Sequence, residues 1–140
     1  MSIQQLTPYL MFNGTAEKAI ELYQRALGAK TENVVRFGEV QGMTVPADQK
    51  SRIMHATLRV GGGLLMASDS MPDKPVAAGD NAHVVLDFDD EKDMAARFDA
   101  LASGGKVTMP LEDTFWGAKF GMLTDAFGIN WMFNCEKKKS

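Results

Sequence analysis

An apolar helical pattern occurs twice in this chain of 140 residues, and the two copies are 75 residues apart. In each copy, five apolar residues share one face of a helix and follow the i, i+1, i+4, i+7, i+8 spacing of an amphipathic segment. They are Ala19, Ile20, Tyr23, Ala26 and Leu27 in the first copy and Met94, Ala95, Phe98, Leu101 and Ala102 in the second. A helix with one apolar face must bury that face against another element, so the repeat predicts two similar modules in tandem.

Segments typical of β-strands surround each predicted helix. The chain reads as one domain, residues 1–140, with module 1 at about 5–69, module 2 at about 82–136 and a Pro- and Gly-containing linker at 70–81. Each module has the order β-α-β-β-β, which predicts an α+β fold. In module 1 the strands are expected at 6–12, 31–37, 52–60 and 64–68 and the helix at 15–27; in module 2 the strands are expected at 82–88, 107–111, 115–123 and 129–135 and the helix from 89 or 90 to 103.

Composition excludes several classes of partner. The net charge is -3 and no broad basic stretch is present, so nucleic-acid binding has no electrostatic support. No apolar run approaches the roughly 20 residues that a membrane-spanning helix needs, and the N-terminal segment lacks the pattern of a signal peptide. The single cysteine, Cys135, cannot form an internal disulfide, which favours a reducing cytoplasm. We therefore expect a cytoplasmic protein without nucleic-acid or membrane partners.

Three segments resemble a known family. They read TPYLMFNGTAEKAIELYQRALGA, HATLRVGG with LLMASD, and DTFWGAKFGMLTDAFGINWMF, and together they span most of the chain. In this combination they resemble the PhnB-like subgroup of the vicinal oxygen chelate superfamily, which includes glyoxalase I, bleomycin-resistance proteins and extradiol dioxygenases. The resemblance implies two β-α-β-β-β modules whose curved sheets surround a cleft. It also implies a homodimer, in keeping with the sheet edges that two helices alone leave uncovered.

The resemblance further implies where a divalent metal would bind. The usual ligands are a histidine or glutamine on the first strand of each module and a carboxylate on the last strand. Matched to this chain, those positions fall on Pro8, approximately Met66, His83 and Met132. Only His83 offers a nitrogen ligand, whereas catalytic zinc typically takes three protein ligands and methionine sulfur is too soft a donor. We therefore expect that the inherited metal site is lost and that no cofactor is bound.

Strand alternation predicts which side chains line the cleft. If His83 faces the cleft, as the resemblance implies, alternation and the 75-residue offset give Leu10, Phe12, His55, His83 and Met132 as the predicted ligand-binding residues. The segment 113–117 is expected to bring Trp116, the sixth, to one rim of the cleft. The same alternation assigns Trp131 and Phe133 to the core. Apolar walls with a few hydrogen-bonding groups are typical of a small-molecule site. The Gly- and Pro-containing segment 38–51 is expected to be a long loop, and a loop of this length is a candidate cover for a pocket.

Three functions remain open at this stage. The first is a metal-free binding protein that captures a small organic ligand. The second is a lyase or isomerase that uses a remodelled metal site or metal-free acid–base chemistry with His55, His83 and Asp69. In that case Asp69 would orient the His55 imidazole and raise its basicity, which makes the two the candidate catalytic residues, although Asp69 could equally cap a turn. The third is a protein that acts mainly by assembly through its sheet edges and aromatic surface.

Overall fold

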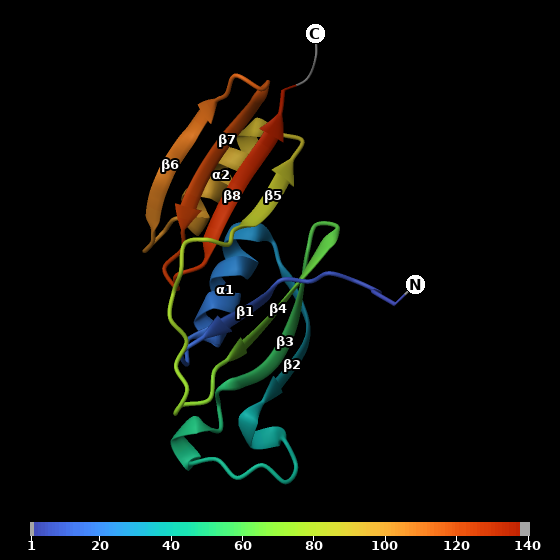
Figure 1. Ribbon diagram of the computed structural model, residues 1–140, viewed down its shortest axis with the longest axis vertical. Helices are drawn as coiled ribbons and strands as arrows, with labels where there is room; N and C mark the ends of the chain where they lie inside the picture. Colours follow the sequence, from blue (N-terminus) through green and yellow to red (C-terminus); the bar gives the residue numbers. More distant parts are fainter. Residues whose placement is uncertain (1, 138–140) are drawn as a thin grey trace. The chain divides into compact units, whose positions relative to one another are not determined.

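The computed structural model describes residues 2–137, which form two compact units divided between Ala77 and Ala78. Within the described residues each unit holds one α-helix and four strands (Figure 1). The first unit comprises β1 Tyr9–Phe12, α1 Ala16–Leu27, β2 Lys30–Arg36, β3 Ile53–Val60 and β4 Gly63–Asp69. The second comprises β5 Val84–Phe88, α2 Glu91–Leu101, β6 Lys106–Asp113, β7 Ala118–Thr124 and β8 Asn130–Glu136.

The two units share one sheet topology. The strand orders are β1-β4-β3-β2 and β5-β8-β7-β6, so in each unit the first strand lies beside the last. That pair is parallel, and the other pairs are antiparallel. The prediction of an α+β fold with two β-α-β-β-β modules is therefore confirmed.

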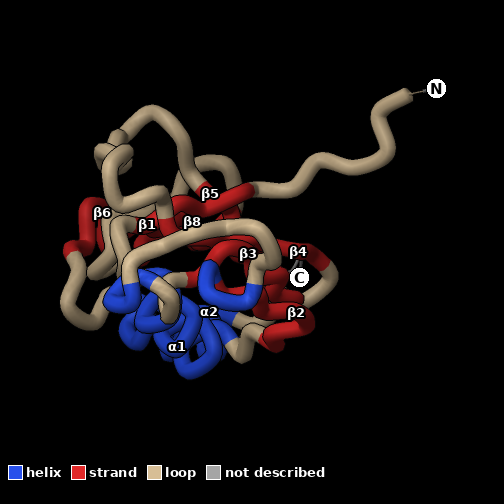
Figure 2. The backbone as a smooth tube through the Cα atoms, turned by 90° about the horizontal axis from the view of Figure 1, so that it is seen from below, coloured by secondary structure: helices blue, strands red, loops and turns tan. Residues whose placement is uncertain are grey.

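Each helix covers one face of its own sheet (Figure 2). In α1 the predicted apolar face is fully buried, and the helix ends at Gly28, whose φ of 67° is the left-handed conformation that glycine adopts most easily. In α2 the buried residues are Met94, Phe98 and Leu101. The ring of Phe98 meets that of Phe133 on β8 edge to face at 5.1 Å, which confirms Phe133 as a core residue.

The two helices begin differently. At α2 the Asp90 side chain accepts hydrogen bonds from the backbone nitrogens of Lys92 and Asp93, as an N-cap does. At α1 the predicted cap, Thr15, makes no such hydrogen bond. Instead, the backbone nitrogen of Ala16, the first residue of α1, donates to a side chain at the end of β4.

The predicted placement of Leu10 and Phe12 in the cleft is wrong. Both are buried, with 8% and 2% of their surface exposed, and they lie on the face of sheet 1 that α1 covers. The prediction used an offset that is one residue too short for the strands. Helices α1 and α2 begin 75 residues apart, but the strands before them end at Phe12 and Phe88, which are 76 residues apart. Because side chains on a strand alternate with a period of two, a shift of one residue moves every side chain to the other face.

Two strand details also differ from expectation. Alternation along the strand puts Met54 on the face of the buried Ala56 and Leu58, yet Met54 is 38% exposed and Ile53 is buried, because the β2–β3 register shifts between Val35 and Arg36. The strand predicted to start at 115 starts at Ala118 instead, so Phe115 and Trp116 lie in the preceding turn. The predicted loop 38–51 contains two short 3-10 helices, Phe37–Glu39 and Ala47–Gln49.

Candidate functional site

Each sheet has one face turned away from its helix, which we call its helix-free face. In sheet 1 the strand register aligns Tyr9, Met66, Thr57 and Asn33 across all four strands. Residues directly opposite one another on neighbouring strands point to the same face. By alternation the helix-free face of sheet 1 is made by Tyr9, Met11, Asn33, Val35, His55, Thr57, Arg59, Leu64, Met66 and Ser68.

The polar centre of this face is His55, as the sequence predicted, together with Thr57, two positions along the same strand, and Tyr9, which the sequence did not connect to it. The hydroxyl of Tyr9 lies 3.0 Å from His55 Nδ1, and Thr57 Oγ1 lies 3.1 Å from His55 Nε2. The Tyr9 side chain comes from β1, on the far side of β4 from β3. Tyr9 is 45% exposed and Thr57 only 8%, so the three side chains form a hydrogen-bonded chain from an accessible end to a buried end.

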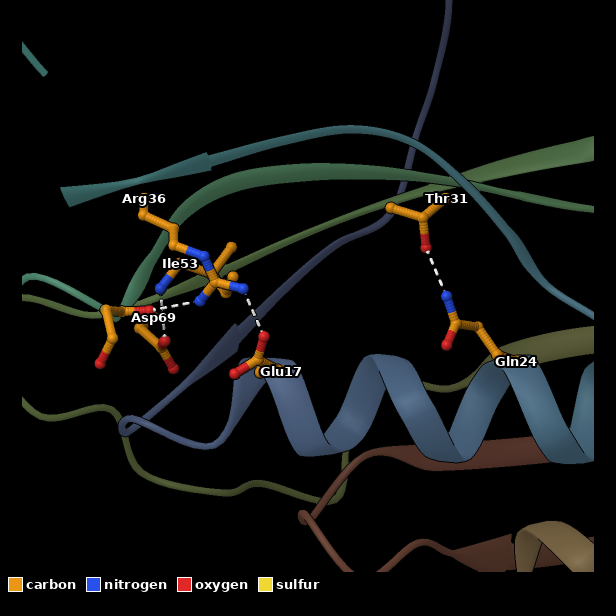
Figure 3. A network of polar contacts seen from close by, with 7 residues as sticks. Glu17, Gln24, Thr31, Arg36, Ile53 and Asp69 are labelled. Carbon is orange, nitrogen blue, oxygen red and sulfur yellow. Dashed lines mark hydrogen bonds and ion pairs between the residues drawn. The ribbon is translucent and has the colours of Figure 1, made fainter. Parts of the chain in front are cut away.

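Asp69 does not belong to this face. It is 4% exposed and pairs in register with the buried Phe12, so it points to the helix side of sheet 1. One carboxylate oxygen accepts a hydrogen bond from Ala16 N at 3.0 Å. The other accepts one from Ile53 N at 2.8 Å, which Figure 3 shows. The predicted catalytic pair of His55 and Asp69 is therefore wrong, because alternation along the hairpin sends the two side chains to opposite faces. Asp69 instead supplies the cap that Thr15 does not.

The helix-free face of sheet 2 is dominated by methionine. The register aligns Met109, Met122, Met132 and Val85 in one row across all four strands. Met109 and Val85 at the two edges are 44% and 51% exposed. Thioethers are flexible and polarisable, so a row of this kind adapts to apolar surfaces of different shape. The sequence predicted the orientation of Met132 but not its methionine neighbours, because the strand register is a tertiary property.

A second row on the same face mixes aromatic and polar groups. Phe120 aligns with Asn134, whose Nδ2 donates to Asp87 Oδ1 at 3.1 Å. Trp116, in the turn before β7, is 55% exposed, and its ring centroid lies 5.8 Å from that of Phe120. This contact brings the predicted aromatic residue to the rim of the helix-free face. Trp116 therefore stands near the methionine row, with Phe120 between them in the sheet.

The remaining predicted residue, His83, lies one position before β5 begins. Its Nε2 is 3.2 Å from the carbonyl oxygen of Asp80, so the imidazole contacts the preceding loop. Because it precedes the strand, the β5 register does not assign it to the face of Val85 and Asp87. His83 and Asp87 are four positions apart, about 13 Å along an extended strand, and this separation prevents them from sharing one metal ion.

The donor set does not fit a divalent metal. The register aligns Tyr9, and not Pro8, with Met66, and it aligns Val85, and not His83, with Met132. This correction has the same cause as that of Leu10, the 76-residue offset of the strands. Neither pair offers the histidine, glutamine or carboxylate ligands expected there. Among the described residues, no group of three or more His, Cys, Asp or Glu side chains could hold a metal ion.

Charged groups near the two faces are engaged in ion pairs. Arg59 Nε contacts Glu32 Oε1 at 2.6 Å at the edge of sheet 1. In unit 2, Lys137 Nζ lies 2.8 Å from Asp113 Oδ2. The hydrogen bond from Lys137, with its positive charge, lowers the pKa of Asp113, and the carboxylate in turn raises the pKa of Lys137.

The sequence and the fold of this chain are both similar to those of known proteins, and the matches indicate one family. Residues 5–133 match the model of the Glyoxalase/Bleomycin resistance protein/Dioxygenase superfamily. Protein YjdN of Escherichia coli (strain K12) is 37% identical over 96% of this chain and 97% of its own length. The crystal structure of protein PA1353 from Pseudomonas aeruginosa is 44% identical with a TM-score of 0.86, covering 97% of this chain and all of that one. PhnB protein from Bacillus cereus is 26% identical with a TM-score of 0.78, covering 94% and 99%.

Membrane-spanning helices are absent from the part of the chain that the structure describes. No helix there combines the length and the hydropathy needed to cross a bilayer.

Proposed function

Because this chain belongs to the Glyoxalase/Bleomycin resistance protein/Dioxygenase superfamily, we propose that it binds a small organic molecule on its helix-free sheet faces without a resident divalent metal. The ligand would contact thioethers and aromatic rings and would be oriented by a few hydrogen-bonding groups. On the helix-free face of sheet 1, His55 and Tyr9 would supply those groups, and on that of sheet 2, taken by itself, the Asn134–Asp87 pair would supply them. This mixture is the usual composition of a small-molecule site.

One observation carries the proposal. At the aligned positions on the first and last strands of the two modules, the chain has Tyr9 with Met66 and Val85 with Met132. The resemblance assigns nitrogen and carboxylate ligands to the first and last strands of each module. Here three of the four side chains are apolar and the fourth is a phenol. On each sheet these side chains would therefore provide contact surface for an organic ligand rather than ligands for an ion.

The test combines metal analysis with a ligand screen. Protein purified without an affinity tag or chelator is analysed for zinc, magnesium, manganese and iron, and we expect far less than one equivalent of each. Stoichiometric metal that is lost in His55→Gln or His83→Gln would overturn the metal-free assignment. A thermal-shift screen against metabolites and antibiotics then identifies the ligand, since a molecule that binds only the folded state raises the melting temperature.

A second candidate is an enzyme that works by metal-free acid–base chemistry. The 3.0 Å contact between the Tyr9 hydroxyl and His55 Nδ1 favours it, because an imidazole within hydrogen-bond distance of a phenol can exchange a proton with it. One measurement distinguishes the two candidate functions. A binding protein returns its ligand unchanged after prolonged incubation, whereas an enzyme yields a product by mass spectrometry, and Tyr9→Phe reduces the yield.

Assembly and location belong to the same proposal. We infer a homodimer, because β1, β2, β5 and β6 are the edge strands of their sheets and such edges are usually paired or covered. We also infer a cytoplasmic location, which suits a chain whose single thiol, Cys135, is buried and reduced.

A further inference from the structure

The hydrogen-bonded chain of Tyr9, His55 and Thr57 has a direction that its burial determines. The Thr57 hydroxyl is the buried end, and its contact with His55 Nε2 is the one side-chain hydrogen bond that it makes among the described residues. A hydroxyl carries one proton to donate, and a buried donor without an acceptor is costly. If Thr57 only accepted from Nε2, its own proton would have no partner in this contact. The favoured arrangement is therefore Thr57 O–H donating to Nε2.

The direction of the Thr57–His55 hydrogen bond determines the direction of the hydrogen bond between His55 and Tyr9, at the solvent-accessible end. An imidazole that accepts at Nε2 carries its proton on Nδ1 when it is neutral. That Nδ1–H donates to the Tyr9 oxygen, 3.0 Å away. The phenolic proton of Tyr9 is consequently not used by His55 and points outward from a side chain that is 45% exposed. Without Thr57 the opposite arrangement would be favoured, since a phenol is a better donor than a neutral imidazole.

We propose that Tyr9 is the polar contact for the ligand, that it donates its hydroxyl proton, and that the ligand presents a neutral carbonyl oxygen beside an apolar body. The proposal rests on the proposed function and names its substrate class. Thr57 and His55 act as positioning residues, because they set the direction of the Tyr9 hydroxyl. Met66, aligned with Tyr9, and Met11, on the same strand, supply the apolar contact.

The charges on this face favour a carbonyl over an anion. Tyr9 and His55 are its central titratable groups, and its cation near the edge, Arg59, is already held by Glu32 at 2.6 Å. A carboxylate or phosphate on this face would have to draw Arg59 away from Glu32. A ketone or amide oxygen needs only the single donor that Tyr9 provides.

The first test needs no ligand. The chain has two histidines, so nitrogen-15 NMR at pH ~8.5, where an ordinary imidazole is neutral, resolves both rings, and His83→Gln assigns them. We expect the His55 proton on Nδ1. Thr57→Val should move it to Nε2, and Thr57→Ser should keep it on Nδ1. Thr31→Val is the matched control, because Thr31 bonds to Gln24 instead.

The second test uses acetophenone and ethylbenzene, which share a ring and a two-carbon substituent and differ by a carbonyl. Carbon-13 labelling of the methionine methyl groups reports where each probe binds, since Met11 and Met66 lie in unit 1 and Met109, Met122 and Met132 in unit 2. We expect acetophenone to shift the Met11 and Met66 signals at lower concentration than ethylbenzene. Tyr9→Phe and Thr57→Val should each weaken acetophenone binding roughly 3- to 10-fold and leave ethylbenzene unchanged.

Specific outcomes would overturn the inference. If the proton of His55 lies on Nε2 in the unmodified protein, the proposed direction of the hydrogen bonds from Thr57 through His55 to Tyr9 is wrong, whichever way the two probes bind. Equal binding of the two probes, or binding of neither near Met11 and Met66, refutes the carbonyl assignment. In each of these cases the proposed function is judged separately, by the metal analysis and the library screen. If both of those fail while the His55 proton lies on Nδ1, the proposed function is wrong but the hydrogen-bond direction stands.

Discussion

The carboxylate of Asp69, at the end of β4, accepts a hydrogen bond at 3.0 Å from the backbone nitrogen of Ala16, the first residue of α1 and 53 positions earlier in the chain. Its other oxygen accepts from the nitrogen of Ile53, which opens β3. One buried side chain thus satisfies two backbone donors and ties α1, β3 and β4 together. Unpaired donors at a helix start are normally satisfied by a local cap, so this long-range contact replaces one.

Removing the Asp69 charge should destabilise the fold. In Asp69→Asn one acceptor oxygen becomes an amino group that faces a backbone N–H, so a buried donor loses its partner. We expect the free energy of unfolding to fall by about 2–3 kcal/mol, measured by urea denaturation. Asp73→Asn, an exposed carboxylate in the following segment, is the control and should change stability little. Equal stability of the two variants would show that the Asp69 contacts do not matter.

Acid should remove a contribution that Asp113 makes to stability. The hydrogen bond from Lys137 and its charge hold the pKa of Asp113 below its ordinary value of 3.8. A group with a lowered pKa in the folded chain stabilises it at neutral pH, and this stabilisation is lost as the pH falls through that lowered pKa. The melting temperatures of the parent protein and of Asp113→Asn should therefore differ at neutral pH and converge at pH values below 3.8. Parallel curves over the whole range would contradict this.

Trp116 should contribute to ligand affinity without contributing much to the fold. Its side chain is 55% exposed and packs on Phe120 at the rim of the helix-free face of sheet 2. We expect Trp116→Ala to weaken binding of a ligand found in the thermal-shift screen by about 1–3 kcal/mol, as measured by calorimetry. Phe115→Ala, which removes a neighbouring ring that is 97% exposed, is the matched control. Unchanged affinity in Trp116→Ala would place the ligand elsewhere.

The protein should have the mass of a dimer in solution. A monomer has a mass of 15.3 kDa, so light scattering at micromolar concentration should give about twice that value. A monomer mass under those conditions would mean that the edge strands remain uncovered, and the homodimer would have to be abandoned. Dilution series measured in parallel separate a weak dimer from a permanent monomer.

Local sequence was sufficient for the elements and their order. The repeat of apolar residues at helical spacing predicted both helices, because burying one face is a property of a short segment and its neighbours. Alternation placed His55 and Met132 on the helix-free faces and Phe133 in the core for the same reason. The length of the strand–helix connection was also readable: three residues separate Phe12 from Ala16, but two separate Phe88 from Glu91. That difference of one residue assigns Tyr9, and not Leu10, to the helix-free face of sheet 1.

Tertiary structure decided what the site contains. The sequence does not say which residues of non-adjacent strands stand opposite one another, because register depends on how whole strands pack together. Register brings the Tyr9 hydroxyl over β4 to His55, and it aligns Met109, Met122 and Met132, which are far apart in sequence. It also turns Asp69 away from His55 and toward α1. The amino-acid sequence by itself therefore determined the elements and the family, whereas the assembled sheets determined which side chains meet, since hydrogen bonds between distant residues form only after the strands have paired.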